Sequence, residues 1–266
     1  MIKLCFSTLG CTDKSLSEVI SIAKRFDISA LEIRGLDGEL NNEKIPDFLP
    51  KNAVNTRRML EDACIFPLIL GTSASFHEKE AYDKNISDAK NAIRIASRVG
   101  FSAIRVFGNI ISGDENEIVL RVANGVRDVC LFAEEFKVSV LLEVHGDFNT
   151  VERLLPIADL CRDLKSFGII WDVCHTHERY GKKWSEFYDP LAPYIRHVHF
   201  KDVKNGKHVL PGDGELPLIE VAEYMIKKGY DGYFSLEWEK YWRKELPEIE
   251  IALEKLVSLF DQKTSN

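Results

Sequence analysis

Four chemically active side chains stand at the ends of apolar segments in the second half of the chain. They are Glu143 after Val-Leu-Leu, Asp172 after Ile-Ile-Trp, His199 within His-Val-His-Phe, and Glu237 after Phe-Ser-Leu. Three carboxylates meeting at one place repel each other, and a bound divalent cation removes that cost. The four residues therefore predict a metal site. Three oxygen ligands and one imidazole favour Mn²⁺, Mg²⁺ or Co²⁺ and also permit Zn²⁺.

The four residues can meet only if the segments that carry them are neighbouring strands. Short β-branched or apolar runs alternate with longer amphipathic stretches along the whole chain. The runs that we expect to form strands are Ile2–Ser7, Ala30–Ile33, Leu68–Gly71, Ala103–Phe107, Ser139–Val144, Gly168–Asp172, His197–Phe200 and Tyr233–Glu237. The stretches that we expect to form helices include Ser15–Phe26, Ala81–Val99, Asn116–Phe136, Val151–Leu164, Leu218–Lys228 and Leu246–Phe260.

Eight such strand–helix units in 266 residues predict one (β/α)₈ TIM barrel, an α/β fold in which residues 1–266 form a single domain. A doubly wound open sheet alternates in the same way, but eight units favour the barrel. The glycine-rich fingerprints of dinucleotide-binding and P-loop proteins are absent from the sequence. In a barrel, the carboxyl ends of the strands form the active site, and this is where the four residues stand.

Composition excludes several classes of protein. The formal net charge is −7, which gives no electrostatic reason to bind nucleic acid or an anionic membrane. No apolar run is long enough to span a bilayer, and the N-terminal residues lack the layout of a signal peptide. The six cysteines form no C-x-x-C pair, and Cys64, Cys130 and Cys161 lie in apolar helical patterns. We expect buried, reduced thiols and a cytoplasmic protein.

Along essentially its whole length, and most specifically in its second half, the chain resembles a known superfamily, the xylose isomerase-like TIM barrels. Within it, the chain is most similar to the sugar phosphate isomerase/epimerase group, which includes tagatose and psicose 3-epimerases and inosose dehydratases. The segments that carry the resemblance are LLEVHGD, WDVCHTH, HVHFKD, PGDGELPL and GYDGYFSLEWE. The resemblance implies one divalent metal ion bound by Glu143, Asp172, His199 and Glu237. It prefers His199 over His197, which we expect to be a core residue or to lie behind the ligands.

The resemblance also implies roles in catalysis and substrate binding. Glu143 and Glu237 would be the catalytic pair, one removing a proton from the sugar and the other returning it. His175 would bind substrate oxygens, and His145 and Lys201 are further candidates for substrate binding, with Asp202 as a partner of Lys201. The epimerases carry an arginine shortly after the metal histidine, whereas residues 203–207 offer only lysines here. Arginine and lysine recognise ligands differently, so this departure leaves the epimerised carbon open.

Further candidates have both structural and functional interpretations. Glu32 and Arg34 end the second expected strand, as an ion pair or as substrate contacts. The Pro211–Glu215 turn is either a cradle for phosphate or hydroxyl groups or a tight turn before the next helix. Side chains that could line the pocket are His77, Phe107, Asn109, Trp184, Trp238 and Trp242.

We therefore expect a divalent-metal-dependent isomerase or epimerase that acts on a sugar, sugar phosphate or keto-sugar by proton transfer through a metal-stabilised enediolate. An inosose-type or keto-sugar dehydratase uses the same chemistry and is the main alternative. An enzyme like the DNA-repair endonuclease IV is disfavoured by the negative charge and by the lack of the additional histidines. A non-catalytic sugar-binding barrel is a third possibility. Relatives of this kind suggest a homo-oligomer.

Overall fold

Eight parallel strands close into a barrel in the computed structural model, which describes residues 2–264. The strand order around the barrel is β1-β10-β7-β6-β5-β4-β3-β2, and β1 pairs with both β10 and β2. The barrel strands are β1 (Lys3–Ser7), β2 (Ala30–Ile33), β3 (Phe66–Ser75), β4 (Ala103–Phe107), β5 (Ser139–Glu143), β6 (Phe167–Asp172), β7 (Ile195–Phe200) and β10 (Tyr233–Leu236). The predicted TIM barrel and its eight strand segments are confirmed.

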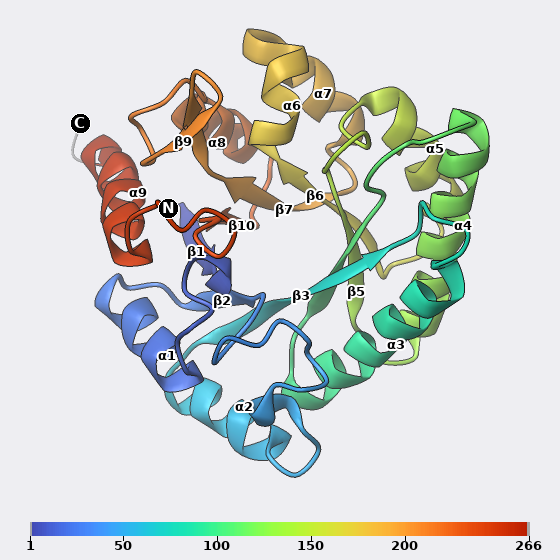
Figure 1. Ribbon diagram of the computed structural model, residues 1–266. Coiled ribbons are helices and arrows are strands. Elements are labelled where there is room, and N and C mark those ends of the chain that lie inside the picture. The colour runs from blue at the N-terminus through green and yellow to red at the C-terminus, as the bar shows by residue number, and fades with distance from the viewer. Residues whose placement is uncertain (1, 265–266) are drawn as a thin grey trace.

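Helices surround the strands as a ring (Figure 1). They are α1 (Leu16–Arg25), α2 (Ala53–Asp62), α3 (Tyr82–Val99), α4 (Glu115–Glu134), α5 (Val151–Cys161), α6 (Val173–Tyr180), α7 (Trp184–Leu191), α8 (Leu218–Lys227) and α9 (Ile249–Thr264), with short 3₁₀ helices η1 (Thr8–Gly10), η2 (Pro46–Phe48) and η3 (Gly181–Lys183). The six helices expected from the sequence are present. The pattern did not reveal α2, α6 and α7, because α2 has few apolar residues, and α6 and α7 are only eight residues long, with Pro190 inside α7.

Local capping chemistry sets the ends of two of these helices. The Ser15 hydroxyl accepts from the backbone N–H of Glu18, whose carboxylate accepts from the backbone N–H of Ser15, so α1 begins with a complete capping box. Gly100 ends α3 in the left-handed conformation, with φ at 108°. Both ends lie where the sequence placed them.

The interior of the barrel has an apolar layer beneath a polar one. Ile69, Ala103, Leu141 and Ile170 form an apolar cluster of their own, separate from the main core between strands and helices. Leu141 and Ile170 each precede a candidate ligand, Glu143 or Asp172, by two residues, so they point to the same side of the strand. The apolar layer thus closes the barrel below the candidate site and leaves its carboxyl-terminal end for polar side chains.

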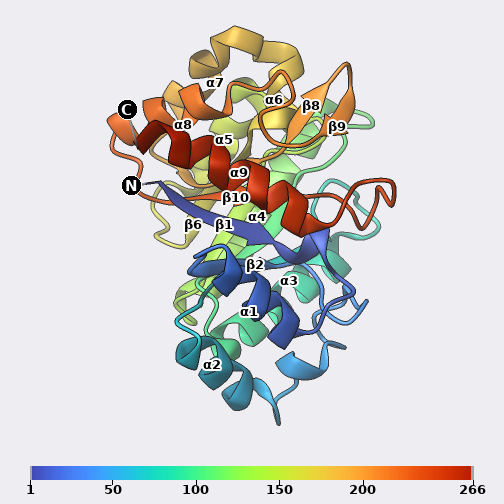
Figure 2. The ribbon, with the colours of Figure 1, turned by 90° about the vertical axis from the view of Figure 1, so that its left-hand side faces the viewer.

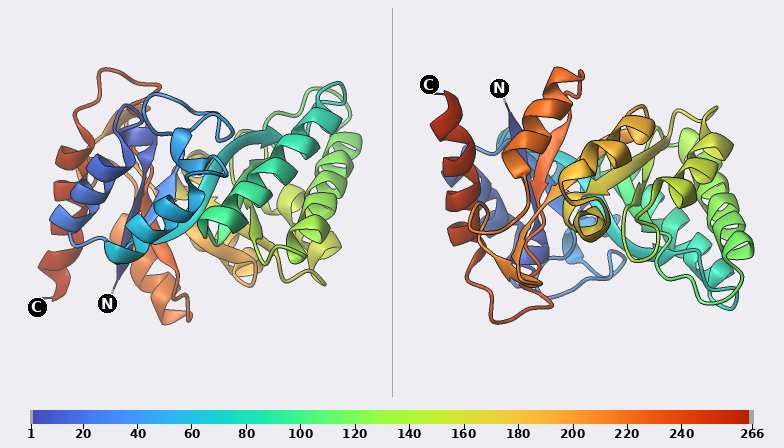
Figure 3. Two further views of the ribbon diagram at one scale, coloured as in Figure 1. Left: turned by 90° about the horizontal axis from the view of Figure 1, so that it is seen from below. Right: turned by 90° about the horizontal axis from the view of Figure 1, so that it is seen from above.

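Two segments lie outside the regular barrel pattern. After β7, β8 (Asp202–Lys204) and β9 (Lys207–Val209) form an antiparallel hairpin that stands apart from the barrel (Figure 2). The last helix, α9, lies over the outside of β1 (Figures 2 and 3). The sequence pattern did not reveal the hairpin, because its strands have only three residues each.

The cysteines partly follow the expectation. Cys130 and Cys161 are buried free thiols in α4 and α5, as predicted. Cys64 is exposed, so that part of the prediction is wrong: it follows the end of α2 in a left-handed conformation, with φ at 57°. Among the helices of residues 2–264, none has both the length and the apolar character needed to cross a membrane.

Candidate metal centre

The four residues singled out in the sequence meet at the carboxyl-terminal end of the barrel. Glu143 and Asp172 are the last residues of β5 and β6, His199 is the penultimate residue of β7, and Glu237 directly follows β10. Each offers one ligand atom, and these four atoms all lie within 4.8 Å of one another. All four residues are buried, with at most 3% of their surface exposed. The barrel therefore places three carboxylates and an imidazole around one point.

Strand register produces this convergence. Asp172 pairs with His199 across β6 and β7, and Ser235 pairs with His199 across β7 and β10. The backbone N–H of Glu237 donates to the carbonyl of Phe200 at 2.9 Å, which extends the β7–β10 pairing by one residue. Because side chains alternate along a strand, Ser235 and Glu237 lie on the same side. A shift of one residue in either strand would turn these side chains away from the barrel interior.

The cluster offers the atoms that a bound cation needs. Glu143 Oε2 and Asp172 Oδ2 are buried beside the charged groups of Arg105 and Lys201, whereas His199 Nδ1 is buried with no hydrogen-bond partner among the described residues. Buried polar atoms are almost always satisfied, so the bare imidazole nitrogen requires an explanation. Together with Glu237, these atoms form the donor set of a hard divalent metal site. The residues present thus fit a divalent ion held by Glu143, Asp172, His199 and Glu237.

Two basic side chains border the cluster. Arg105 Nη1 lies 3.0 Å from Glu143 Oε2 and 3.2 Å from Glu237 Oε1. Lys201 Nζ lies 2.8 Å from both Asp172 Oδ2 and Glu237 Oε2, and 2.6 Å from Glu239 Oε1. Arg105 and Lys201 are almost fully buried. They are in contact with five carboxylates, those of Glu32, Glu143, Asp172, Glu237 and Glu239. This excess of negative charge is a second reason to expect a bound cation.

The carboxylates differ in their protonation equilibria. Burial raises the pKa of Asp172 to about 6, with only partial compensation by Lys201. The pKa of Glu143 is lowered despite burial, because of the Arg105 guanidinium, and that of Glu237 is lowered well below its usual range by Lys201 and His199. Burial opposes the charged form of His199, but the carboxylates around it, Glu32 foremost, raise its pKa well above the usual value. Glu143 and Glu237 are thus ionised at neutral pH and can accept protons.

Glu32 lies beneath the ligand cluster and not in the substrate space. It is fully buried, and its Oε2 lies 2.9 Å from Nε2 of His199 and 3.4 Å from Nε2 of His197. The Ser235 hydroxyl donates to the same oxygen at 3.3 Å. Among the described residues Glu32 forms no ion pair with Arg34, and it lies where it can support the candidate metal-binding histidine from behind. His197, buried beside Glu32, lies where the sequence placed it, behind the ligands.

Arg34 contributes to the wall of a cavity above the cluster. Its Nη2 donates to the Ser73 hydroxyl at 2.6 Å and its Nη1 to the carbonyl of Leu40 at 3.4 Å. The cavity has a volume of about 350 Å³, within the roughly 300–1,000 Å³ of small-molecule sites. Its lining includes two candidate ligands and one candidate substrate-binding histidine, and consists of Leu9, Arg34, Ser73, Arg105, Phe107, Asn109, Glu143, His145, Glu237, Glu239 and Trp242.

The two candidate substrate-binding histidines stand together at the mouth of the barrel. The rings of His145 and His175 have centroids 4.5 Å apart. His175 Nε2 lies 3.9 Å from Asp172 Oδ2 and has no hydrogen-bond partner among the described residues. Burial, assisted by Lys201, lowers the pKa of His175 to about 3, so this imidazole is neutral and can donate or accept a hydrogen bond.

The glycine-rich turn is not a phosphate cradle. The Asp202 carboxylate accepts from the backbone N–H groups of Val203, Gly212, Gly214 and Leu216 at 2.9–3.1 Å. The N–H groups of Asp213 and Glu215 donate to carbonyls of the same region. These donors are therefore not free to bind a ligand, and the tight-turn interpretation holds. The prediction that Asp202 pairs with Lys201 is wrong, because Asp202 organises this turn.

The structure adds residues that the sequence analysis missed. Arg105 was not considered as a site residue, although an arginine inside the apolar run Ala-Ile-Arg-Val-Phe of β4 is a detectable signal. Glu239 stands two residues after Glu237 and reaches Lys201. Of the three tryptophans expected near the pocket, only Trp242 lines the cavity. Trp238 is fully buried and donates to the carbonyl of Pro247, and Trp184 packs against Trp171.

Comparisons with known proteins agree with this architecture. The family model described as xylose isomerase-like TIM barrel matches residues 20–259. A curated relative, fructoselysine 3-epimerase of Escherichia coli O157:H7, is 26% identical over 129 residues, which cover 46% of this chain and 46% of the relative. The match thus spans about half the length of that protein.

Two solved structures share the fold over nearly the whole chain. The structure of the IOLI protein with a bound zinc atom has a TM-score of 0.79 at 18% identity and covers 97% of both chains. The probable 3-DHS dehydratase AsbF from Bacillus anthracis has a TM-score of 0.77 at 17% identity, covering 96% of this chain and 98% of that one. At these identities the two likenesses show a common fold.

Proposed function

Because the chain belongs to the xylose isomerase-like TIM barrel family, we propose that it is a divalent-metal-dependent isomerase or epimerase of a sugar or keto-sugar. The observation that carries the proposal is the convergence of Glu143, Asp172, His199 and Glu237 on one point below a cavity. The unpartnered Nδ1 of His199 and the excess of carboxylates over basic side chains support a resident cation. The relative that acts as an epimerase supports the reaction class.

The reaction proposed is proton transfer at the carbon next to a carbonyl. A divalent ion at the four residues supplies a Lewis acid that polarises the carbonyl and offsets negative charge on oxygen. Glu143 and Glu237 both line the cavity, and their lowered pKa values keep them ionised. Either carboxylate can therefore remove the carbon proton. Neutral His175, beside His145, is suited to hold substrate hydroxyl groups, and Arg34 lines the opposite part of the cavity.

Isomerisation and epimerisation differ in how many carboxyl groups must carry the transferred proton. An isomerase needs one carboxylate, because the proton can return from the same carboxyl group to the neighbouring carbon. An epimerase returns a proton to the opposite face of the same carbon, and the second glutamate must carry that proton when it delivers it. The pair Glu143 and Glu237 offers a carboxyl group from each of two strands, β5 and β10, as this second reaction requires.

Dehydration is the second candidate. It begins with the same proton removal, but a second acid must protonate a departing hydroxyl group. The adjacent rings of His145 and His175 place two further hydrogen-bonding groups at the mouth of the site. The structural similarity to AsbF, itself described as a probable dehydratase, keeps this reaction in consideration.

One experiment distinguishes these reactions. The protein, loaded separately with Mn²⁺, Mg²⁺, Co²⁺ or Zn²⁺, is incubated with a panel of ketoses and keto-sugars in D₂O, and products are identified by NMR and mass spectrometry. An isomerase or epimerase gives a product that has the same atoms as the substrate, apart from hydrogen exchanged for deuterium. An epimerase that uses two bases places deuterium at the inverted carbon. A dehydratase gives a product that has lost one water. Absence of metal-dependent turnover across the panel, with no deuterium exchange, would contradict the proposed function.

A further inference from the structure

One residue with an unusual backbone conformation lines the cavity above the ligand cluster. Asn109 follows β4 and has φ at 72°, in the left-handed region that residues other than glycine rarely adopt. It lines the cavity together with Phe107, Glu143 and His145. Unusual backbone conformations that persist beside a binding site are commonly part of how the site works.

The other non-glycine residues with left-handed backbone have ordinary turn roles. Asp27, Cys64 and Lys137 come shortly after the ends of α1, α2 and α4, where a left-handed residue is common. Asp37 and Asn205 each precede a glycine in a two-residue turn between paired strands. Asn109 instead lies in the irregular segment between β4 and α4, where neither a helix end nor a hairpin requires this conformation.

The loop after β5 holds Asn109 in place. The backbone N–H of Asp147 donates to the carbonyl of Asn109 at 2.8 Å, and the Asp147 carboxylate accepts from the backbone N–H of Ile111 at 2.8 Å. Gly146 has no room for a side chain, because a Cβ there would lie 2.5 Å from the Asn109 carbonyl oxygen. The loops after β4 and β5 are thus locked together, and the Asn109 carbonyl faces the β5 loop.

The side chain of Asn109 takes no part in this lock. Among the described residues, Asn109 forms hydrogen bonds only through its backbone carbonyl. Asparagine side chains near turns commonly bond to neighbouring backbone groups, which compensates for an unusual conformation. Here no such bond is formed, so the carboxamide keeps one acceptor and two donor hydrogens for a ligand.

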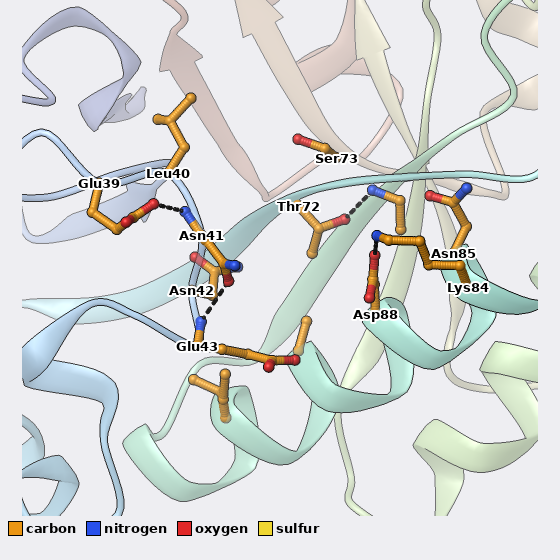
Figure 4. Close-up of a pocket in the computed structure, with 13 residues that line it drawn as sticks. Glu39, Leu40, Asn41, Asn42, Glu43, Thr72, Ser73, Lys84, Asn85 and Asp88 are labelled. Carbon is orange, nitrogen blue, oxygen red and sulfur yellow. Dashed lines mark hydrogen bonds and ion pairs between the residues drawn. The ribbon is translucent and has the colours of Figure 1, made fainter. Parts of the chain in front are cut away.

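A contact between Arg34 and Ser73 closes the cavity on the side of β2 and β3. Arg34 donates to the Ser73 hydroxyl at 2.6 Å and to the carbonyl of Leu40 at 3.4 Å. Beyond this contact lies a second cavity, whose walls are the loop after β2, the outer part of β3 and the first turns of α3 (Figure 4). The substrate is therefore confined to the first cavity, which Asn109 lines.

Asn109 is one of two polar lining residues whose side chains lack a partner within the described chain. The other is His145, whose Nδ1 is buried without a hydrogen bond and which is already proposed to hold substrate. The remaining polar lining residues contact one another or the barrel cluster: Arg34 with Ser73, Arg105 with Glu143 and Glu237, and Glu239 with Lys201. Asn109 is thus available to a ligand at a position that the locked loops fix.

We propose that the Asn109 carboxamide binds a substrate hydroxyl group remote from the reacting carbon, and so selects substrates that carry this hydroxyl group. The inference rests on the proposed function for the position of the sugar. A hydroxyl group both donates and accepts, as the carboxamide does, so the two groups match. A ligand that lacks the hydroxyl group leaves the carboxamide unpaired, which should weaken binding about three- to tenfold.

Ligands that each lack one hydroxyl group test this contact. The probes are the D-2-ketohexoses and their monodeoxy analogues, titrated by calorimetry into the metal-loaded protein. With the wild type, one monodeoxy analogue of a bound ketohexose should bind about three- to tenfold more weakly than its parent because of Asn109. In Asn109→Gly, which removes the carboxamide and suits a left-handed backbone, that analogue and its parent should bind equally. The other analogues should differ from the parent by the same factor in both proteins.

Stability measurements separate a ligand contact from a structural role. Glycine adopts the left-handed conformation without strain, so Asn109→Gly should not lower the urea midpoint of the metal-loaded protein. Asn205→Gly is the matched control. Asn205 is also left-handed, with φ at 49°, but lies in the β8–β9 turn and does not line the cavity. Its replacement should leave both affinity and discrimination unchanged.

Four results would overturn the inference: equal binding of all monodeoxy analogues and their parents by the wild type, discrimination that persists in Asn109→Gly, equal weakening of parents and all analogues in that variant, or no binding of any ketohexose. Turnover of the ketohexoses is measured separately on the same preparations. Turnover without discrimination rejects the role of Asn109 and leaves the proposed function intact. Discrimination that depends on Asn109, without turnover, rejects the proposed reaction and supports the contact.

Discussion

Oε2 of Glu32 lies 2.9 Å from Nε2 of His199, on the side of the imidazole that faces away from the candidate ligands. The other ring nitrogen, Nδ1, lies 3.7 Å from Glu143 and 3.5 Å from Glu237. Once a cation takes the place of the Nδ1 proton, a hydrogen bond from Nε2–H to Glu32 keeps the ring oriented with the Nδ1 lone pair toward that cation. Such carboxylate–histidine contacts orient metal-binding imidazoles and raise their basicity. Glu32 thus explains how a histidine in the barrel interior is presented to a cation.

Replacement of Glu32 should weaken metal binding without removing a ligand. Glu32→Gln keeps an acceptor for Nε2–H but loses the charge, and we expect about tenfold weaker Mn²⁺ binding, with a larger loss for Glu32→Ala. Calorimetric titration with Mn²⁺ measures this change, and thermal unfolding of the metal-free protein checks the fold. Glu61→Gln, at an exposed position of α2, is the matched control. Unchanged affinity in Glu32→Ala would show that His199 needs no support from Glu32.

The two glutamates of the ligand set should separate binding from catalysis. Glu143→Gln and Glu237→Gln each retain an oxygen ligand but cannot accept a proton, so turnover should fall by about 10²–10⁴-fold. Metal affinity should fall much less than turnover, and the circular dichroism spectrum should be unchanged. Kinetics with the substrate found in the panel, together with metal titration, provide both numbers. If either variant retains full activity, that residue is not the proton-transfer group.

Asp202 should matter for folding of the loop after β9 and not for chemistry. It is 1% exposed and accepts from four backbone N–H groups, so Asp202→Ala leaves four donors without their acceptor. We expect a loss of about 2–4 kcal/mol in the free energy of unfolding. Urea denaturation measures this loss. The free energy of unfolding of Asp202→Asn should lie between those of the wild type and Asp202→Ala.

Gly214→Ala tests the same arrangement from the opposite side. A Cβ at position 214 would lie 2.1 Å from Asp202 Oδ1, so the alanine must displace the carboxylate. We expect Gly214→Ala to lower the free energy of unfolding, as Asp202→Ala does. Combining the two substitutions should lower it little further, because both disrupt one hydrogen-bond network. Fully additive losses in the double variant would contradict this account.

A surface ion pair predicts part of the acid dependence of stability. Arg127 donates to both carboxylate oxygens of Asp163, at 2.6 and 2.9 Å, and lowers the pKa of Asp163 to about 2. A depressed pKa stabilises the fold above the unfolded-state value of about 4, and this stabilisation is lost as the pH falls through the folded-state value. The difference in urea midpoint between wild type and Asp163→Asn should therefore be smaller at about pH 3 than at about pH 6.

Asp159→Asn is the control for that comparison. Asp159 is exposed on the adjoining helix α5 and has no ion pair within residues 2–264. Its replacement should leave the midpoint nearly unchanged at both pH values. A difference for Asp163→Asn that grows toward low pH would contradict the assigned direction.

Sequence reasoning was strongest where one physical requirement dominates. Buried parallel strands demand apolar runs, so all eight barrel strands could be predicted, and polar residues at their ends pointed to Glu143, Asp172, His199 and Glu237. The role of Glu32 could not be predicted in this way. Its partner His199 is far away in sequence, and only closure of the barrel, with β1 between β2 and β10, brings the two together.

Other features depend on loop conformation, which hydrophobic patterns do not encode. Asp202 follows Lys201 directly, so a local pair was a reasonable expectation, yet the turn of residues 211–216 folds back onto the carboxylate. Arg105 was visible as a charge inside an apolar strand, but its contacts with Glu143 and Glu237 required the relative heights of three strands. The second cavity depends on the loop after β2, for which the sequence offered no regular pattern.

A crystal of the Mn²⁺-loaded protein, measured for anomalous scattering at the manganese edge, tests the central claim most directly. Two groups of side chains compete for the ion: Glu143, Asp172, His199 and Glu237, or Glu32, His197 and His199. We predict one anomalous peak within coordination distance of the first group, with His199 Nδ1 facing it and Glu32 still bonded to Nε2. A peak among Glu32, His197 and His199, or no peak in the barrel at saturating Mn²⁺, would contradict the proposed metal centre.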